Sequence, residues 1–262
     1  MEKRDTKVVI LCGGEGKRIR DTAEHLPKPL INIGDKPILW HIMKIYSAQG
    51  YKNFVLCLGY KGHLIRDFFL NYGHYHNDIE IDMPSGQIKK NGHSDIEDWK
   101  ITLVDTGHKT NTGLRLHKVR KYLEGQDYFM LTYGDGVSNV DLDKLISFHK
   151  SRNKIGTITG VRSLSKYGQV KTDEEGIINS FKEKPLLDDA VNGGFMVFNR
   201  EFLDHPLLPL DVSLEEVLIS LSEQKRLALC LHSGFWHSMD TTRDFEELNK
   251  IWDSGNVPWR IW

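Results

Sequence analysis

The sequence predicts an α/β fold in which a mixed, mostly parallel sheet is flanked by helices. From Val8 onward, short apolar runs alternate with longer segments whose apolar residues recur every three or four positions, which is typical of strand–helix–strand units. After Ile155 the pattern changes to shorter strand-like runs. The 262 residues suit one domain. We therefore expect a single domain, 1–262, with an α/β first half (about 1–154) and a second half (about 155–262) that is richer in short strands.

Composition excludes several classes of protein. The 35 basic and 36 acidic residues nearly cancel, so a basic nucleic-acid-binding surface is not expected. No stretch approaches the roughly 20 apolar residues that cross a bilayer, and the N-terminal MEKRDTK lacks the apolar core of a signal peptide. Cys12, Cys57 and Cys230 lie in apolar runs, as buried reduced thiols do. We expect a cytoplasmic protein with neither nucleic-acid nor membrane partners.

The elements of the first half follow from local pattern. Val8 to Leu11 is a β-branched run suited to a buried parallel strand. Pro37 opens a helix that Gly50 ends. Further strands are expected at 54–58, 101–104 and 128–132, and further helices at 64–72, 112–123 and 141–151. The polar, turn-rich stretch 84–98 interrupts this order, as a lid, an oligomer contact or a surface excursion.

The second half is predicted from shorter signals. Strands are expected at 155–161, 169–172, 177–181, 191–198 and 227–231, and helices at 213–222 and 241–252. The turn at Glu174 to Gly176 makes a hairpin of the second and third of these strands. Gly193 and Gly194 inside a strand indicate a bulge or the close approach of a ligand. The aromatic tail (Trp252, Trp259, Trp262) is expected to pack on the body or on a neighbouring subunit.

A glycine-rich loop, CGGEGKR, follows the first strand. Gly13, Gly14 and Gly16 permit positive φ and close backbone approach to a ligand, and successive N–H groups in such a turn can bind an anion. Lys17 and Arg18 follow where phosphate charge would need neutralising. The loop is neither a Walker A motif nor a full GxGxxG fingerprint. Phosphate binding and a simple tight turn both remain open.

Three aspartates lie where a ligand could reach them. Asp105 and Asp135 follow strands, and ligands of open α/β sheets bind at the carboxyl ends of strands. Asp135, flanked by glycines, could hold Mg²⁺ or satisfy turn amides. Asp240, before the last helix, could serve as a metal ligand or as an N-cap.

Two groups of lysines complete the candidate ligand-binding residues. Lys28 lies between Pro27 and Pro29, whose restricted backbone would aim its ammonium, although it could equally be an exposed loop lysine. Lys182 and Lys184 follow a strand, where a solvated charged end is the plain alternative.

Taken together, these motifs resemble those of the sugar-1-phosphate nucleotidyltransferase family. The resemblance covers essentially the whole chain, in the order CGGEGKR, PKP, GYKG, VDTG, YGDG, FKEKP, NGGF and FWHSMDTTRD. The stretches KPILWHIMKIYSAQGYKNFVLCLGYKG, ITLVDTG, TYGDGV and GNVPW are most similar to its glucose-1-phosphate cytidylyltransferase branch. The resemblance implies a Rossmann-like, GT-A-like fold, a nucleotide-binding first half, a sugar-binding second half and a homo-oligomer.

The resemblance also implies roles for individual residues. Arg18 and Lys28 would contact the triphosphate of CTP, Lys184 would neutralise the sugar phosphate, and these three would be catalytic. Asp135 and Asp240 would hold Mg²⁺. The implied nucleotide-binding residues are Leu11, Gly13, Gly14, Gly16, Lys17, Arg18, Lys28, Asp105, Thr106, Gly107 and Asp135. The implied sugar-binding residues are Tyr133, Gly168, Glu183, Lys184, Gly193 and Gly194.

The chain departs from the family pattern in three places. Lys17 stands where the family commonly has Thr, so a charge replaces a hydroxyl contact. Thr112 to Arg115 reads TGLR where the family usually has TGGR. Lys166 to Val170 reads KYGQV in place of RFGAL, a region that lies beside the sugar in relatives.

The implied reaction is attack by a sugar 1-phosphate, glucose 1-phosphate or a relative, on the α-phosphorus of CTP, which releases pyrophosphate. A phosphomonoester has its second pKa at about 6, so this nucleophile needs no general base. Alternatives are a nucleotidyltransferase with another nucleotide or acceptor, and a catalytically silent nucleotide-sugar-binding subunit. A NAD-dependent oxidoreductase is suggested only by the glycine loop, which lacks the full fingerprint.

Overall fold

The central feature is a seven-stranded sheet, seen in a computed structural model that describes residues 2–16, 18–19, 25–91, 96–162, 165, 167–187 and 189–262. Lys17, a predicted nucleotide contact, lies outside the described residues. The strands of this sheet are β1 (Lys7–Cys12), β4 (Asn53–Leu58), β7 (Lys100–Asp105), β8 (Tyr128–Tyr133), β10 (Gly156–Val161), β13 (Val191–Asn199) and β14 (Leu227–His232). Their order is β14-β10-β13-β8-β1-β4-β7. Only β13 runs antiparallel to its neighbours, which confirms the predicted mixed, mostly parallel sheet.

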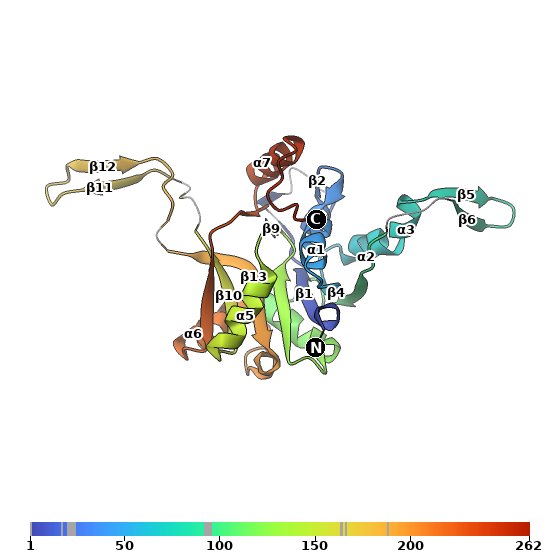
Figure 1. The fold of residues 1–262 in the computed structure, drawn as a ribbon, viewed down its shortest axis with the longest axis horizontal. Helices are drawn as coiled ribbons and strands as arrows, with labels where there is room; N and C mark the ends of the chain where they lie inside the picture. The colour runs from blue at the N-terminus through green and yellow to red at the C-terminus, as the bar shows by residue number, and fades with distance from the viewer. Residues whose placement is uncertain are drawn as a thin grey trace.

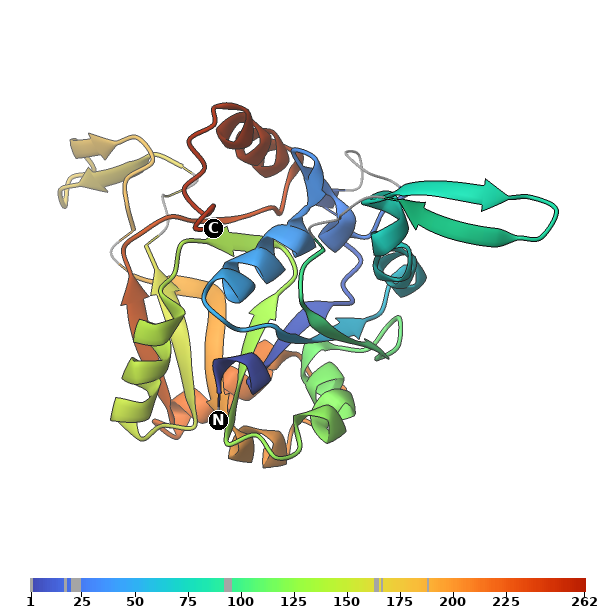
Figure 2. The same ribbon diagram turned by 45° about the vertical axis from the view of Figure 1, so that its right-hand side comes forward.

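Helices cover both faces of the sheet (Figures 1 and 2). They are α1 (Ile38–Ala48), α2 (Gly62–Leu70), α3 (Tyr72–Tyr75), α4 (Thr112–Val119), α5 (Leu142–Arg152), α6 (Leu214–Glu223) and α7 (Thr242–Asp253), with 3₁₀ turns η1 (Lys3–Asp5), η3 (Lys28–Leu30), η4 (Arg120–Leu123) and η5 (Arg200–Asp204). Val8 and Ile10 of β1 belong to the core under α1 and α5, whereas Val9 and Leu11 belong to the core under α4 and α6. Burial on both faces explains why this strand is apolar throughout.

Four two-stranded ladders surround the main sheet. They are formed by β2 (Asn32–Ile33) with β3 (Lys36–Pro37), β5 (Asp78–Asp82) with β6 (Gln87–Asn91), β9 (Gly136–Ser138) with β15 (Trp236–Ser238), and β11 (Gln169–Thr172) with β12 (Ile178–Lys182). The hairpins β5–β6 and β11–β12 project away from the body on opposite sides (Figure 1). The second was predicted. The first was not, because the sequence interpretation recognised only the polar stretch 84–98 and missed the alternation of acidic residues and isoleucine in β5.

Of the two positions predicted for the aromatic tail, the structure shows packing on the body. Trp259 is fully buried, and its Nε1 donates to Nδ1 of His41 at 3.4 Å. The ring of Trp252 lies 4.9 Å from the His41 ring, and Nε2 of His41 bonds the carbonyl of Ile33 at 2.9 Å. Burial lowers the pKa of His41 to about 4, so the imidazole is neutral at pH 7. No helix in the described part of the chain has the length and apolar character to cross a membrane.

His41 makes the stability of the fold depend on pH. Its pKa is about 4 in the folded protein and about 6.5 in the unfolded chain, so its contribution is complete above pH 6.5 and is lost as the pH falls toward 4. We expect the free energy of unfolding to fall by about 2 kcal/mol between pH 7 and pH 5 because of this group. Urea titrations of the wild type and His41→Gln measure it; equal pH slopes for the two proteins would contradict the assignment.

Candidate active site

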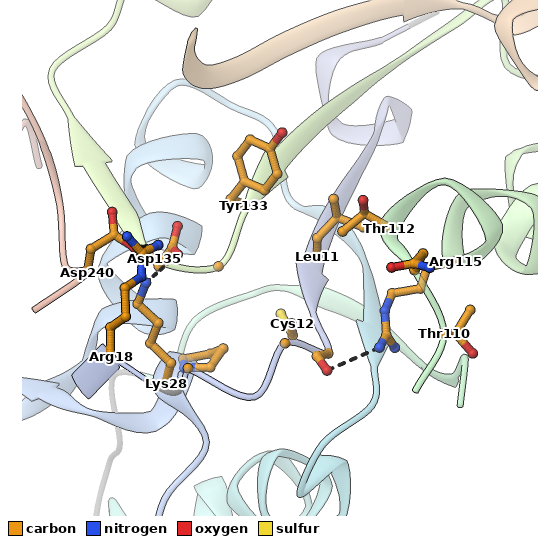
Figure 3. A pocket seen from close by; sticks show the side chains of 16 residues that line it. Leu11, Cys12, Arg18, Lys28, Thr110, Thr112, Arg115, Tyr133, Asp135 and Asp240 are labelled. Carbon is orange, nitrogen blue, oxygen red and sulfur yellow. Dashed lines mark hydrogen bonds and ion pairs between the residues drawn. The ribbon is translucent and has the colours of Figure 1, made fainter. Parts of the chain in front are cut away.

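A cavity of about 460 Å³ opens at the carboxyl ends of β1 and β8 (Figure 3). Its walls come from the glycine loop after β1, the η3 turn, the start of α4, the end of β8 and the segment before α7. The cavity is lined by Leu11, Cys12, Gly13, Gly14, Gly16, Arg18, Lys28, Pro29, Thr110, Asn111, Thr112, Arg115, Tyr133, Gly134, Asp135 and Asp240. The position agrees with the rule that ligands of open α/β sheets bind beyond the carboxyl ends of strands.

One end of the cavity is a compact cluster of charges. The Nζ of Lys28 donates to Oδ2 of Asp135 at 2.6 Å and to Oδ1 of Asp240 at 2.8 Å. Arg18 donates from Nη2 to the same Asp240 oxygen at 3.3 Å, and Ser238 donates to its other oxygen at 3.0 Å. Figure 3 shows the side chains of Arg18 and Lys28 beside those of the two aspartates. The structure therefore brings together four predicted residues (Arg18, Lys28, Asp135, Asp240) that lie far apart in the sequence.

The cluster keeps its groups charged. Burial on its own would lower the pKa of Lys28, but the carboxylates of Asp135 and Asp240 outweigh burial and raise it. Burial likewise pushes the pKa of Asp240 upward, but hydrogen bonds from Lys28 and Ser238 outweigh it and hold this pKa below its usual value. An ammonium between two carboxylates is therefore the stable arrangement at neutral pH.

A short ladder explains how the two aspartates meet. In the antiparallel pair β9–β15, Gly136 lies opposite Ser238. One step further along, the N–H of Met239 donates to the carbonyl of Asp135 at 2.8 Å. Asp135 and Asp240 therefore flank the end of the same ladder and point to the same side. The η3 turn carries Lys28 to these aspartates, and its buried residues Pro29 and Leu30 anchor the turn in the core.

The carboxylate pair fits a divalent metal. One oxygen of each aspartate lies within 2.8 Å of a single nitrogen, so the two oxygens converge on one point. Mg²⁺ is commonly held by one or two carboxylates, with water and substrate phosphates completing its shell. In the described part of the chain, no group of three or more His, Cys, Asp or Glu side chains could hold a metal ion. A metal at Asp135 and Asp240 would therefore take its other ligands from substrate and solvent.

The N-cap alternative for Asp240 is wrong. The N-cap of α7 is Thr241, whose side chain accepts from the N–H of Asp244 while the Asp244 carboxylate accepts from the N–H of Thr241. Asp244 also accepts from the backbone N–H of Asp240. This capping box leaves the side chain of Asp240 to the charge cluster.

Arg115 dominates the other end of the cavity, and the sequence interpretation did not assign it a role. It is almost fully buried in α4. Its guanidinium donates to the hydroxyl of Thr106 (2.7 Å) and to the carbonyls of Gly107 (2.9 Å), Leu58 and Gly13 (3.1 Å each) and His108 (3.2 Å). The signal was present, because Arg115 precedes Leu116 on the face of α4 that packs on the sheet.

The glycine loop fits around this guanidinium. A Cβ at Gly13 would lie 2.1 Å from Nη1 of Arg115, so a larger side chain there would displace the guanidinium. Gly16 adopts φ +58°, as the predicted turn requires. Gly14 has open space around it and faces the cavity. The loop is thus shaped by Arg115 at Gly13 and left free to meet a ligand at Gly14.

Asp105, Thr106 and Gly107 support the site without lining the cavity. The hydroxyl of Thr106 is buried and donates to the carbonyl of Leu58 at 2.6 Å. A carboxylate oxygen of Asp105 accepts from the N–H of Gly107 at 2.9 Å. These contacts fix the loop after β7, whose Thr106 hydroxyl and Gly107 carbonyl accept hydrogen bonds from Arg115. Direct contact between these three residues and a nucleotide stays a prediction.

The predicted sugar-binding residues fall into two groups. Tyr133 lines the cavity and donates from its hydroxyl to Glu215 at 2.7 Å. A Cβ at Gly194 would lie 2.9 Å from its ring, and the adjacent Gly193 accepts from Trp236 Nε1. In contrast, Gly168, Glu183 and Lys184 lie at the base of the β11–β12 hairpin and are not among the lining residues, and Glu183 pairs with Lys184 at 3.8 Å. Their role at the sugar stays a prediction.

Arg115→Met tests whether the hydrogen bonds of the buried guanidinium hold the surrounding loops together. We expect the free energy of unfolding to fall by about 3 kcal/mol, because the substitution leaves buried carbonyls without a donor. Arg120→Met is the matched control, since Arg120 follows directly after α4 and, among the described residues, its one ion pair is the exposed pair with Asp204, worth at most about 1 kcal/mol. Urea unfolding of both variants measures the difference. Equal stability of the two variants would show that the buried guanidinium does not hold the loops together.

Comparison with known proteins agrees with this geometry. The family model described as "Nucleotidyl transferase" matches residues 7–253. Two relatives named glucose-1-phosphate cytidylyltransferase, from Salmonella typhi and Salmonella typhimurium, are each 41% identical over 259 residues, which cover 98% of this chain and 99% of theirs. In fold, the chain is similar to the crystal structure of HddC from Yersinia pseudotuberculosis, with a TM-score of 0.67, 22% identity and coverage of 94% and 99% of the two chains. The chain belongs to the nucleotidyl transferase family.

Proposed function

We propose that the protein transfers a cytidylyl group from CTP to glucose 1-phosphate, which gives CDP-glucose and pyrophosphate for CDP-sugar and surface polysaccharide synthesis. One observation carries the proposal: the cluster of Lys28, Arg18 and two carboxylates stands at one end of a cavity that the glycine loop lines. The names of relatives that are 41% identical over nearly the whole chain support the choice of CTP and glucose 1-phosphate.

CTP would occupy the cavity with its phosphates toward the charge cluster. Leu11, Gly13 and Gly14 would face the nucleoside, and the loop at Gly16 would wrap the triphosphate. Arg18 and Lys28 carry the positive charge that the phosphates require. When bound to the two aspartates, Mg²⁺ would neutralise phosphate charge and polarise the reacting phosphoryl group.

The chemistry asks the protein for positioning and charge neutralisation. An oxygen of the sugar phosphate forms a bond to the α-phosphorus of CTP, and the bond from that phosphorus to the β-phosphate oxygen breaks as pyrophosphate leaves. The nucleophile is largely ionised at neutral pH, because its second pKa is about 6. Arg18 and Lys28 would hold the phosphates in line and spread their charge. Lys184 and Glu183 would approach the sugar phosphate and sugar hydroxyls from the base of the β11–β12 hairpin.

Two further properties belong to the proposal. The exposed apolar side chains of the two hairpins, among them Ile79, Ile81, Ile178 and Phe181, are suited to burial in a homo-oligomer. The three free cysteines, two of them buried, suit a reducing cytoplasmic location.

The choice of substrates is tested by incubating the protein and Mg²⁺ with each of four nucleoside triphosphates and several sugar 1-phosphates. We expect pyrophosphate release and a nucleotide sugar mainly with CTP and glucose 1-phosphate. A preference for another pair would replace these substrates within the same family. Nucleotide-sugar binding without any turnover would instead support a catalytically silent subunit.

Asp135→Asn tests the assignment of the catalytic centre. We expect turnover to fall by about a thousandfold or more, because the variant loses a carboxylate that supports charge neutralisation at the reacting phosphates. Asp143→Asn is the matched control, since Asp143 also pairs with a lysine at 2.6 Å but lies on α5, outside the cavity. Pyrophosphate release and circular dichroism measure activity and fold. Near-normal release by a folded Asp135→Asn protein would rule out the assignment.

A further inference from the structure

The ammonium of Lys28 lies at the point where a metal would bind. Its distances of 2.6 and 2.8 Å to the carboxylates of Asp135 and Asp240 are full ion-pair contacts. Mg²⁺ would require these same oxygens at about 2.0–2.1 Å. Two cations that share both oxygens would lie close enough to repel each other strongly. Metal and ammonium therefore compete for the aspartate pair.

The backbone of Lys28 is fixed, but its side chain can leave the pair. The flanking prolines restrict the segment, Pro29 and Leu30 are buried, and the N–H of Ile31 donates to the Lys28 carbonyl at 3.1 Å. The side chain is a flexible four-carbon stem. A Cβ at Gly16 would lie 3.1 Å from the Cβ of Lys28, so the stem starts beside the glycine loop. The ammonium can therefore swing toward a triphosphate on that loop without any backbone change.

The two aspartates depend on Lys28 to different degrees. Asp240 also accepts from Arg18 and Ser238, so it keeps partners if the ammonium leaves. For Asp135, within the described ranges, Lys28 is the only cation that forms an ion pair. Departure of the ammonium would leave Asp135 half-buried and without a counter-ion, unless another cation takes its place. Departure of the Lys28 ammonium from Asp135 therefore favours the binding of a metal, and metal binding favours that departure.

We propose that Lys28 is an exchangeable counter-ion that keeps a divalent metal off the Asp135–Asp240 pair until a nucleoside triphosphate draws the ammonium away. The identity of the triphosphate rests on the proposed function, but the competition at the two carboxylates does not. Metal alone then binds weakly, and metal with nucleotide binds strongly. The metal joins the site only when the phosphates it must neutralise are present.

The test measures two affinities in the absence of turnover. Binding of Mn²⁺ alone is followed by the electron paramagnetic resonance signal of the free ion, and binding of CTP in EDTA is followed by calorimetry. Lys28→Gln should bind Mn²⁺ about tenfold more tightly than the wild type, because it removes the cation that competes for the two carboxylates. It should bind CTP about tenfold more weakly, because it removes a cation that attracts the triphosphate. Lys28→Arg keeps the charge and should bind Mn²⁺ as weakly as the wild type.

Lys3→Gln is the matched control, because it also breaks a 2.6 Å lysine–aspartate pair but lies on the surface, away from the cavity. It should leave both affinities unchanged. A purely structural role for Lys28 would weaken Mn²⁺ and CTP binding together, and that result, or unchanged Mn²⁺ affinity, would overturn the proposal. A wild-type protein that binds no CTP would contradict the proposed function, while the Mn²⁺ comparison would still decide the role of Lys28.

Discussion

The ion pair between Lys28 and two aspartates is the interaction on which the site depends. Its three members come from a turn after β1, the end of β8 and the segment before α7, and a single nitrogen joins them. A buried ammonium is costly unless anions surround it, and a buried carboxylate pair is costly unless a cation does. Each partner therefore makes the position of the others favourable, and the arrangement is also suited to exchange one cation for another.

A second set of polar contacts, made by Arg115, stabilises the other end of the cavity. The guanidinium of Arg115 collects the carbonyls that end β4 and follow β1 and β7, where parallel strands leave acceptors without partners. The glycine loop is therefore hydrogen-bonded where it contacts Arg115 and open where it faces the cavity. One end of the cavity is therefore shaped by Arg115, and the other carries the charge cluster that the proposed phosphate chemistry requires.

The sequence predicted the sheet and its helices well, because strands buried on both faces leave apolar runs, as in β1, and amphipathic helices leave a regular period. It also predicted that the glycine loop and Asp135 lie at one edge, since the ends of parallel strands share an edge, whereas Lys28 was added only by the family resemblance. It could not decide between the two roles of Asp240, because the ladder β9–β15 that precedes it is three residues long and leaves no pattern. Arg115 was missed although it lies on the buried face of α4, because four of its five acceptors are backbone carbonyls, which no side-chain motif reveals.

The direction in which the β11–β12 hairpin projects could not be predicted from the sequence either. Motifs placed Glu183 and Lys184 with the sugar, but a hairpin with no buried face gives no sign of where it points. The charge cluster is therefore formed by contacts within the body of this chain, whereas the proposed sugar subsite depends on the position of this hairpin.

The most direct test of the central claim is a crystal structure of the protein with CTP and Mg²⁺. The account predicts that the ammonium of Lys28 contacts a phosphate oxygen of the nucleotide and that the metal lies between Asp135 and Asp240. A complex in which Lys28 remains paired with both aspartates, and the metal and triphosphate bind elsewhere, would contradict it.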